Sequence, residues 1–387
     1  MSSSRHGRPL VFLLRVAIFL LVFGVVAEVW FRSVMPACEW PVGYQQRPST
    51  MLRYDPKGPT YGLYTTGRLC RRGGEWRVNN AGWNSGVDYA SAAQRRRPMI
   101  ALVGDSYIEG FLTDTDEHID AYLPKMLPGT DSYAFGVSGW YLEQYVAVSR
   151  YARVRFQPDV LVVFIDELDV RDSSVAPPNL WGIRDVGGKY VEIPPTSAKT
   201  YSQERSAVIR YLRFNARLAV PSPRAVRDRI VARLARRGNT LGSEAPQAGE
   251  DAGAEAGVSS HEVQAAADFM VGRLCSDHPG TPIVFVAHRQ PSYLNGWDTS
   301  DRYLPMQDVA HTPLFPDGRA VEAACEGRAQ CSFIDLRYAF SRDWAAHHVR
   351  FESADGAHWS AYANRVVART LADVITKSAL LSRAPTP

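Results

Sequence analysis

Short apolar runs alternate with longer stretches of helical character between residues 99 and 379 of this 387-residue chain. Runs dominated by Val, Ile, Leu, Phe and Ala predict buried β-strands. The predicted strands are Met99–Val103, Ser132–Phe135, Asp159–Ile165, Pro282–Ala287 and Ser332–Asp335. The predicted helices lie near 117–127, 140–155, 260–277, 317–327 and 359–379. Strands that alternate with helices predict an α/β fold with a parallel sheet covered by helices on both faces.

The N-terminal pattern is different, because Pro9–Phe31 is apolar apart from Arg15 and Glu28. A helix of this length crosses a hydrocarbon core of about 30 Å. Arg5 and Arg8 precede it, which favours an N-terminus in the cytoplasm. We therefore expect residues 1–8 to be cytoplasmic and residues 9–31 to form a transmembrane signal-anchor.

A cleaved signal peptide is the alternative interpretation of the same segment. Arg15 shortens the apolar core, and Val25–Ala27 is an acceptable cleavage site. The apolar run continues through Val29 and Trp30, which favours the retained anchor. Both interpretations place the rest of the chain outside the cytoplasm, which in a bacterium means the periplasmic side, where disulfides form. The retained anchor also places the domain on the inner membrane.

The exported part divides by composition. Residues 32–97 have no helical period and predict an accessory segment of short strands and loops. Residues 98–380 carry the α/β pattern, interrupted by an insertion at 173–260 whose last part, 239–260, is rich in Ala, Gly and acidic residues and is expected to be a disordered linker. Within the insertion, Arg224–Arg237 predicts a basic amphipathic helix that lies on anionic lipid or polyanionic glycan, or else packs on the main domain.

Composition and charge exclude several functional classes. The chain is 45% hydrophobic and 22% charged, as folded globular proteins are. A net charge of +4 is too small to indicate nucleic-acid binding. Five cysteines form no CxxC pair, so we expect no structural zinc, no other metal site and no cofactor. Cys325 with Cys331 is a plausible local disulfide, and Cys38 with Cys70 is a second possibility.

The first candidate for chemistry is the sequence Val103-Gly104-Asp105-Ser106-Tyr107, at the end of the first predicted strand. Ligands bind at the carboxyl edge of a parallel sheet. A serine there, on a turn that opens a helix, exposes both its hydroxyl and its own N–H. Ser106 is therefore a candidate nucleophile and a candidate oxyanion donor, although Gly-Asp-Ser is also an ordinary turn sequence.

The second candidate is Asp355-Gly-Ala-His358-Trp359, just before the last predicted helix. This spacing brings the Asp355 carboxylate to one imidazole nitrogen of His358 and leaves the other nitrogen for a serine. The alternative is that Asp355 caps the final helix and His358 is a surface residue.

The third candidate is the run Phe135-Gly136-Val137-Ser138-Gly139, after the second predicted strand. A glycine at this edge lets the backbone approach a reacting carbonyl group. The Gly139 N–H can then join the Ser106 N–H in an oxyanion hole. A plain strand-to-helix turn is the alternative interpretation.

Together these motifs resemble the SGNH/GDSL hydrolase superfamily of serine esterases and acyltransferases. The matching segments, in family order, are GDSY (104–107), GVSGW (136–140) and DGAHW (355–359). The resemblance covers residues 98–380 without the insertion, and it implies a flavodoxin-like three-layer α/β/α sandwich. It also implies Ser106 as nucleophile, His358 as base and Asp355 as the residue that orients His358. VNNAGWNSG (78–86), together with Glu28 and Arg32, resembles a membrane-anchored bacterial subgroup.

One family block departs from the pattern. The third block is usually Gly-x-Asn-Asp, with Asn as an oxyanion donor, but here Leu168 precedes Asp169. Leucine donates no hydrogen bond. An Asn is also missing before the glycine loop, where Ala134 stands. We expect a weakened enzyme, because one lost donor typically costs about 2.7–4 kcal/mol of transition-state stabilisation.

Three further residues are candidates for substrate binding. Tyr107 follows the nucleophile, and Trp140 follows the glycine loop, where it would stack on a sugar ring unless it packs in the core. His288 ends the fourth predicted strand and either contacts substrate or is a satisfied edge histidine.

These features lead to a hypothesis of an extracytoplasmic serine esterase or O-acyltransferase. Its expected substrate is an acylated, in the first instance acetylated, cell-envelope glycan or another ester. Its expected partners are the membrane and an envelope polysaccharide machinery, not nucleic acid. Hydrolysis and transfer stay open, with a lean towards transfer. The alternative is a weak or inactive member of the fold that binds glycan or acts as a scaffold.

Overall fold

The computed structural model describes residues 7–46, 51–197, 204–218, 259–288, 309, 311–353 and 355–382. The chain divides into two compact units. One consists of residues 1–38, 67–70 and 204–258, and the other of residues 39–66, 71–203 and 259–387. Arg224–Arg237 and residues 239–258 of the expected linker lie outside the described residues, and residue 260 already begins a helix.

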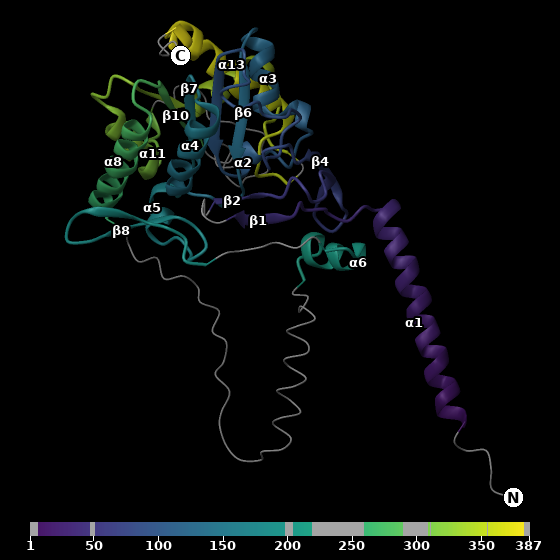
Figure 1. The fold of residues 1–387 in the computed structure, drawn as a ribbon. Coiled ribbons are helices and arrows are strands. Elements are labelled where there is room, and N and C mark those ends of the chain that lie inside the picture. Colours follow the sequence, from purple (N-terminus) through teal and green to yellow (C-terminus); the bar gives the residue numbers. More distant parts are fainter. Residues whose placement is uncertain are drawn as a thin grey trace, which may run out of the picture. The chain divides into compact units, whose positions relative to one another are not determined.

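A five-stranded parallel sheet forms the centre of the second unit (Figure 1). Its strands are β5 (Met99–Gly104), β6 (Asp131–Gly136), β7 (Val160–Ile165), β10 (Ile283–Ala287) and β11 (Cys331–Asp335). They lie in the order β11-β10-β7-β5-β6. Numbered along the chain from β5, this is the flavodoxin-like order 2-1-3-4-5. The prediction of a parallel α/β sheet from the five apolar runs is confirmed.

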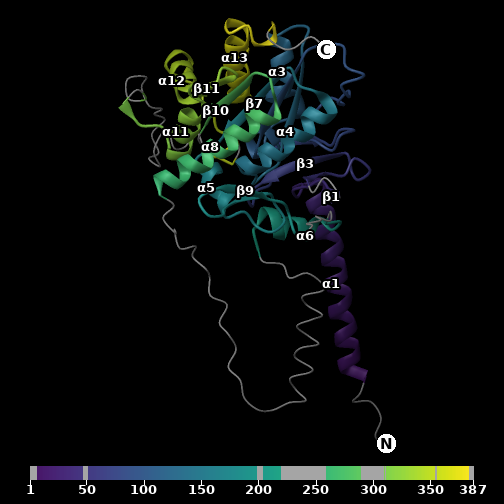
Figure 2. The ribbon, with the colours of Figure 1, turned by 60° about the vertical axis from the view of Figure 1, so that its left-hand side comes forward.

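Helices cover both faces of this sheet, as Figures 1 and 2 show. One face carries α3 (Ile119–Met126), α12 (Leu336–His347) and α13 (Ala361–Lys377). The other carries α4 (Leu142–Phe156), α8 (Ser260–Asp277) and α11 (Pro316–Cys325). Successive side chains of β5 alternate between the two cores, because neighbouring residues of a strand point to opposite faces.

Polar side chains fix the starts of two of these helices. Ser259 and Glu262 form a reciprocal capping box at the start of α8, with hydrogen bonds of 3.3 and 2.8 Å. Ser360 caps α13 by accepting the Ala363 N–H at 3.3 Å. This second cap places the Asp355–His358 loop directly before α13.

Three hairpins accompany the sheet. The predicted accessory segment forms β1 (Gly43–Gln46) with β2 (Met51–Tyr54), and β3 (Tyr61–Thr66) with β4 (Arg71–Arg77). The predicted insertion contributes β8 (Gly182–Asp185) with β9 (Tyr190–Ile193).

The first unit contains α1 (Gly7–Ser33), whose Val11–Ser33 stretch is long and apolar enough to cross a membrane. Its last turns contact α6 (Ala207–Arg210) and the π-helical turn η2 (Tyr211–Asn215). The Glu28 carboxylate accepts the Ala207 N–H at 2.9 Å and the Val208 N–H at 3.2 Å. The end of the apolar helix is therefore held by specific polar contacts.

The cysteines of the second unit are arranged differently from the predicted local pair. Cys325 and Cys331 are not joined by a disulfide. The Cys331 sulfur lies 3.7 Å from that of Cys275, because the start of β11 lies beside the end of α8, and the Cys325 thiol also contacts Cys331. Cys38 and Cys70 are both buried, and their pairing stays a prediction.

Candidate active site

The nucleophile turn joins β5 to the short helix α2 (Ser106–Glu109). The Asp105 carboxylate caps α2 by accepting the Tyr107 N–H at 3.0 Å. Gly110, with φ of 73°, ends the helix in the left-handed region. Ser106 is thus half-buried at the carboxyl edge of a central strand, and its N–H has no hydrogen-bond partner among the described residues.

The loop before α13 brings the base to this serine. The Nε2 atom of His358 lies 2.9 Å from the Ser106 Oγ, and its Nδ1 atom lies 2.6 Å from the Asp355 Oδ2. The other oxygen, Oδ1, accepts the N–H groups of Ala357 and His358 at 2.9 and 3.0 Å, which fixes the carboxylate. The structure thus brings together the three residues predicted to be catalytic, across 252 residues of sequence.

The electrostatics of this pair suit a base and its orienting group. Burial opposes ionisation of Asp355, but the hydrogen bonds from the His358 ring and from two backbone N–H groups hold its pKa well below the usual range. Burial also opposes protonation of His358, but the Asp355 carboxylate outweighs it and raises the pKa of the imidazole. Asp355 therefore stays ionised next to the His358 ring, as the orienting carboxylate of a catalytic triad does.

The predicted oxyanion loop follows β6. Ser138 and Gly139 are exposed, and Gly139 has a φ of 74° with open space where a side chain would stand. The Gly139 N–H has no hydrogen-bond partner in the described ranges. It is available, as the Ser106 N–H is, to bind a developing oxyanion.

The third block lies between β7 and α5 (Asp169–Ser174). Leu168 immediately precedes α5, and its side chain is 47% exposed. Asp169 is buried and accepts the Asp166 N–H at 2.8 Å, so it holds this turn together. The block keeps its structural acid and has no side-chain donor at position 168.

Two of the residues predicted to bind substrate instead support the base. The buried Tyr107 donates its hydroxyl proton to the Ala357 carbonyl at 3.2 Å, and its ring lies 5.0 Å from that of His358. His288 is 1% exposed and packs against the rings of Tyr107 and Trp359. Burial lowers the pKa of His288 to about 4, so the ring is neutral near pH 7. Contacts with distant loops cover both side chains.

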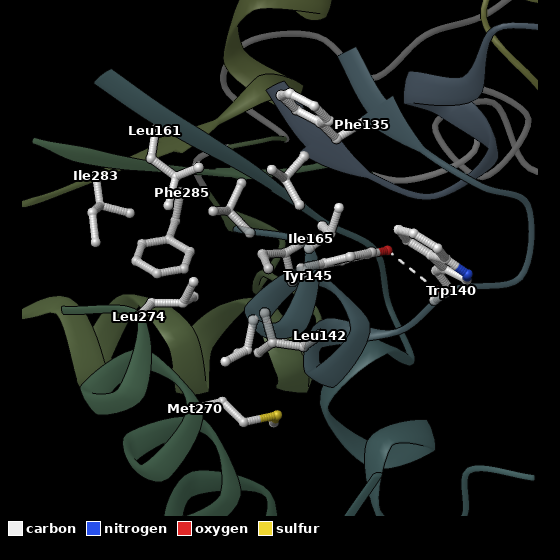
Figure 3. Close-up of a cluster of buried hydrophobic side chains, with 14 of the residues drawn as sticks. Phe135, Trp140, Leu142, Tyr145, Leu161, Ile165, Met270, Leu274, Ile283 and Phe285 are labelled. Carbon is white, nitrogen blue, oxygen red and sulfur yellow. Dashed lines mark hydrogen bonds between the residues drawn. The ribbon is translucent and has the colours of Figure 1, made fainter. Parts of the chain in front are cut away.

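Trp140 also does not present a ring to a sugar in this structure. Its side chain is 3% exposed and lies edge-on to Trp83, with ring centroids 6.0 Å apart. Figure 3 shows it at the border of the core between α4 and the sheet, where the Tyr145 hydroxyl donates to its carbonyl at 3.2 Å. The core interpretation of this residue replaces the expectation of sugar stacking.

The segment VNNAGWNSG, ahead of β5, supports the nucleophile helix. The Asn79 side chain accepts the N–H groups of Ala81 and Trp83, both at 3.0 Å, and so shapes a turn. Asn84 then donates to the Glu109 carbonyl at the end of α2 at 2.7 Å. Glu109 itself is a buried acid next to the site that the sequence analysis did not identify. Its only signal in the sequence is a charge one helical turn after the nucleophile.

Several observations now coincide. A serine follows the first strand, a glycine loop follows the second, and an Asp-x-x-His pair precedes the last long helix on a 2-1-3-4-5 sheet. This arrangement resembles that of the SGNH/GDSL superfamily. The site is built from side chains and main-chain N–H groups. In the ranges that the structure covers, no group of three or more His, Cys, Asp or Glu is placed to hold a metal ion.

No family model and no curated protein matches the sequence. Among solved structures, the chain is similar to a carbohydrate esterase family 2 enzyme of Corynascus thermopiles (Myceliophthora fergusii), with 13% identity over 76% of this chain and 69% of the other, and a TM-score of 0.37. TesA is 12% identical over 72% and 98%, with a TM-score of 0.36. A salicylyl-acyltransferase from a tetracycline biosynthetic pathway is 11% identical over 74% and 55%, with a TM-score of 0.39. The resemblance to the SGNH/GDSL superfamily lies in the three motifs and in the contacts of Ser106, His358 and Asp355.

Proposed function

We propose that this protein is a membrane-anchored serine esterase or O-acyltransferase that acts outside the cytoplasm on an acylated envelope glycan. The observation that carries the proposal is the contact of His358 with both Ser106 and Asp355, at 2.9 and 2.6 Å. A nucleophile and a base within hydrogen-bond distance, with the base oriented by a carboxylate, is the arrangement that activates a serine hydroxyl.

The reaction follows from the positions of these atoms. The Ser106 Oγ attacks the ester carbonyl carbon and gives its proton to the His358 Nε2, while the N–H groups of Ser106 and Gly139 bind the oxyanion. The carbon–oxygen bond to the alcohol then breaks, and His358 returns the proton to the leaving oxygen. The resulting acyl-Ser106 ester is attacked by water or by a sugar hydroxyl, again with His358 as the base.

The placement of the domain is part of the proposal. Val11–Ser33 would span the inner membrane once, with residues 1–8 in the cytoplasm and the catalytic domain in the periplasm. The retained anchor is supported by the polar contacts of Glu28 with α6 and by the stacking of Phe31 on Tyr211, with ring centroids 4.0 Å apart. Glu28 and Phe31 lie just after Ala27, the expected cleavage site of a signal peptide. Cleavage there would separate both residues from the rest of the helix.

The choice of substrate follows from this placement. An anchored domain outside the cytoplasm meets polysaccharide, and Ser-His-Asp chemistry acts on esters such as O-acetyl groups. An envelope polysaccharide machinery is the proposed partner. Water and a sugar hydroxyl remain competing acceptors of the acyl group. A parallel measurement of acetate release and of acetyl transfer to added oligosaccharides separates hydrolysis from transfer.

A fluorophosphonate experiment tests activity and placement together. Cells whose outer membrane has been permeabilised are treated with a probe that does not cross the inner membrane, and lysed cells with a permeant one. We expect both probes to label the wild-type protein at Ser106 and neither to label Ser106→Ala, because only an activated serine attacks the phosphorus atom. Labelling by the permeant probe alone would place the domain in the cytoplasm. Labelling by neither would favour the inactive scaffold that Leu168 suggests.

Position 168 gives a prediction of increased activity. Replacing the exposed Leu168 with Asn is expected to raise kcat on p-nitrophenyl acetate by about tenfold or more, because one oxyanion donor is typically worth about 10²–10³ in kcat. Leu168→Ala, which removes the apolar side chain and adds no donor, is the matched control. Equal rates for the two variants would show that a side chain at this position does not reach the oxyanion.

A further inference from the structure

Glu109 joins the nucleophile helix to the oxyanion loop. It is the last residue of α2, and its side chain is almost fully buried. One carboxyl oxygen, Oε2, accepts the Ser138 N–H at 2.8 Å and also the Ser138 hydroxyl. The other oxygen, Oε1, accepts the Tyr54 hydroxyl from β2. Three donors therefore converge on a single acid.

The position of Ser138 makes this contact relevant to catalysis. Ser138 directly precedes Gly139, and both residues are exposed. Within the loop, the Trp140 N–H bonds to the Val137 carbonyl at 3.2 Å. The hydrogen bonds from Ser138 to Glu109 are thus what ties the Gly139 peptide to the helix that carries Ser106.

We infer that ionised Glu109 is a positioning residue that sets the Gly139 N–H relative to Ser106, and that protonation of Glu109 weakens the oxyanion hole. The inference rests on the proposed serine chemistry. An ionised carboxylate accepts all three hydrogen bonds, whereas a carboxylic acid carries a proton on one oxygen and needs an acceptor for it. The Ser138 N–H can only donate, and the Ser138 and Tyr54 hydroxyls would have to reverse and accept, so protonated Glu109 keeps its contacts with the loop only as weaker, uncharged hydrogen bonds.

The surroundings of Glu109 place its protonation near neutrality. Burial, together with the nearby Asp105 carboxylate, raises the pKa of Glu109 to about 7. The hydrogen bonds from Ser138 and Tyr54 oppose this effect and lower the pKa. His358 faces the same region from the loop before α13, and the Glu109 charge contributes to its raised pKa. As the pH falls, Glu109 gains a proton and His358 is lost as a base, so both events lower the rate.

The test is the pH dependence of kcat/KM on p-nitrophenyl acetate. For the wild type we expect the acid limb to fall in two stages, a loss of about tenfold when Glu109 is protonated and a full loss, with a slope of one, when His358 is protonated. For Glu109→Gln we expect only the second stage, at lower pH, because only His358 still titrates and the neighbouring charge is gone. Above both pKa values, we expect kcat of this variant to fall about tenfold with little change in KM, since an oxyanion donor acts mainly in the transition state.

A second variant guards against a purely structural explanation. Tyr54→Phe removes a hydrogen bond that favours ionised Glu109, so we expect the acid limb to move to higher pH. In the Glu109→Gln background, Tyr54→Phe should leave the position of the acid limb unchanged. Asp120→Asn is the matched control, because Asp120 is another buried acid with a raised pKa, bonded to Ser85 at 2.9 Å and not to the loop.

The outcomes separate the inference from the proposed function. A Glu109→Gln enzyme that keeps the acid limb of the wild type would overturn the role of Glu109. An acid limb that stays in place in Tyr54→Phe would do the same. A wild-type protein without activity on any ester would instead contradict the proposed function itself.

Discussion

Replacing Ser106 with Ala is expected to lower kcat for ester cleavage by about 10⁴-fold or more, with no change in melting temperature. The hydroxyl is the only group of Ser106 that the substitution removes, and among the described residues it bonds to His358 at 2.9 Å. His358→Ala should have a similar effect, and the double variant should be little worse than either single one, because the triad acts as a unit. Steady-state kinetics with p-nitrophenyl acetate measure all three.

Ser149→Ala is the matched control for this series. Ser149 is a buried serine of α4 whose hydroxyl donates only to the Val146 carbonyl, at 2.8 Å. Its loss should leave kcat unchanged. Unaltered turnover in Ser106→Ala would end the proposal of an acyl-serine intermediate.

The second large effect is expected at Gly136, the last residue of β6. A Cβ atom there would lie 2.5 Å from the Glu109 nitrogen and 2.7 Å from the Asp105 carbonyl oxygen. Both atoms belong to the backbone of the nucleophile turn, which has no flexible end that can move aside. Gly136→Ala should therefore destabilise the fold by about 3 kcal/mol and displace Ser106. A displacement of about 1 Å typically costs about 10² in rate.

A glycine-to-alanine change in α8 provides the comparison. At Gly272 the nearest atom to an added Cβ is the Arg328 Nη1, at an ordinary 3.7 Å. Gly272→Ala should keep full activity and gain up to about 1 kcal/mol in stability, since alanine favours a helix. Thermal unfolding and kcat, measured on both variants, test the contrast. A Gly136→Ala protein with wild-type melting temperature and activity would contradict the packing described here.

The sheet was predictable because burial on both faces leaves a simple signal. The strands β5, β7 and β10 are fully buried and appear in the sequence as unbroken apolar runs. The helix α12 was missed because its buried face is partly charged. Arg337 on that face binds the Asp335 carboxylate at 2.6 Å, and Asp343 accepts the Tyr362 hydroxyl at 2.6 Å. Charged residues on the buried face interrupt the apolar period by which an amphipathic helix is recognised. The sequence does not show that these charges are paired in the folded protein.

Some residues of the candidate site could be predicted from the sequence and others could not. Ser106, Asp355 and His358 stand in short motifs whose order along the chain is informative. Glu109 has no such motif, because its role depends on Tyr54 and Ser138, which are 55 and 29 residues away. Tyr107 and Trp140 were expected at the substrate, but the exposure of an aromatic side chain is decided by distant segments that pack on it.

The long separation between serine and base has a consequence for biosynthesis. Ser106 meets His358 across 252 residues, and α13 follows directly after that contact. While the ribosome extends the chain, the nucleophile turn emerges long before the imidazole that activates it. Every nascent or prematurely terminated chain lacking residue 358 carries an unactivated serine. The proposed esterase activity is therefore acquired only after residue 358 has been added to the chain, when all five strands of the sheet have been made.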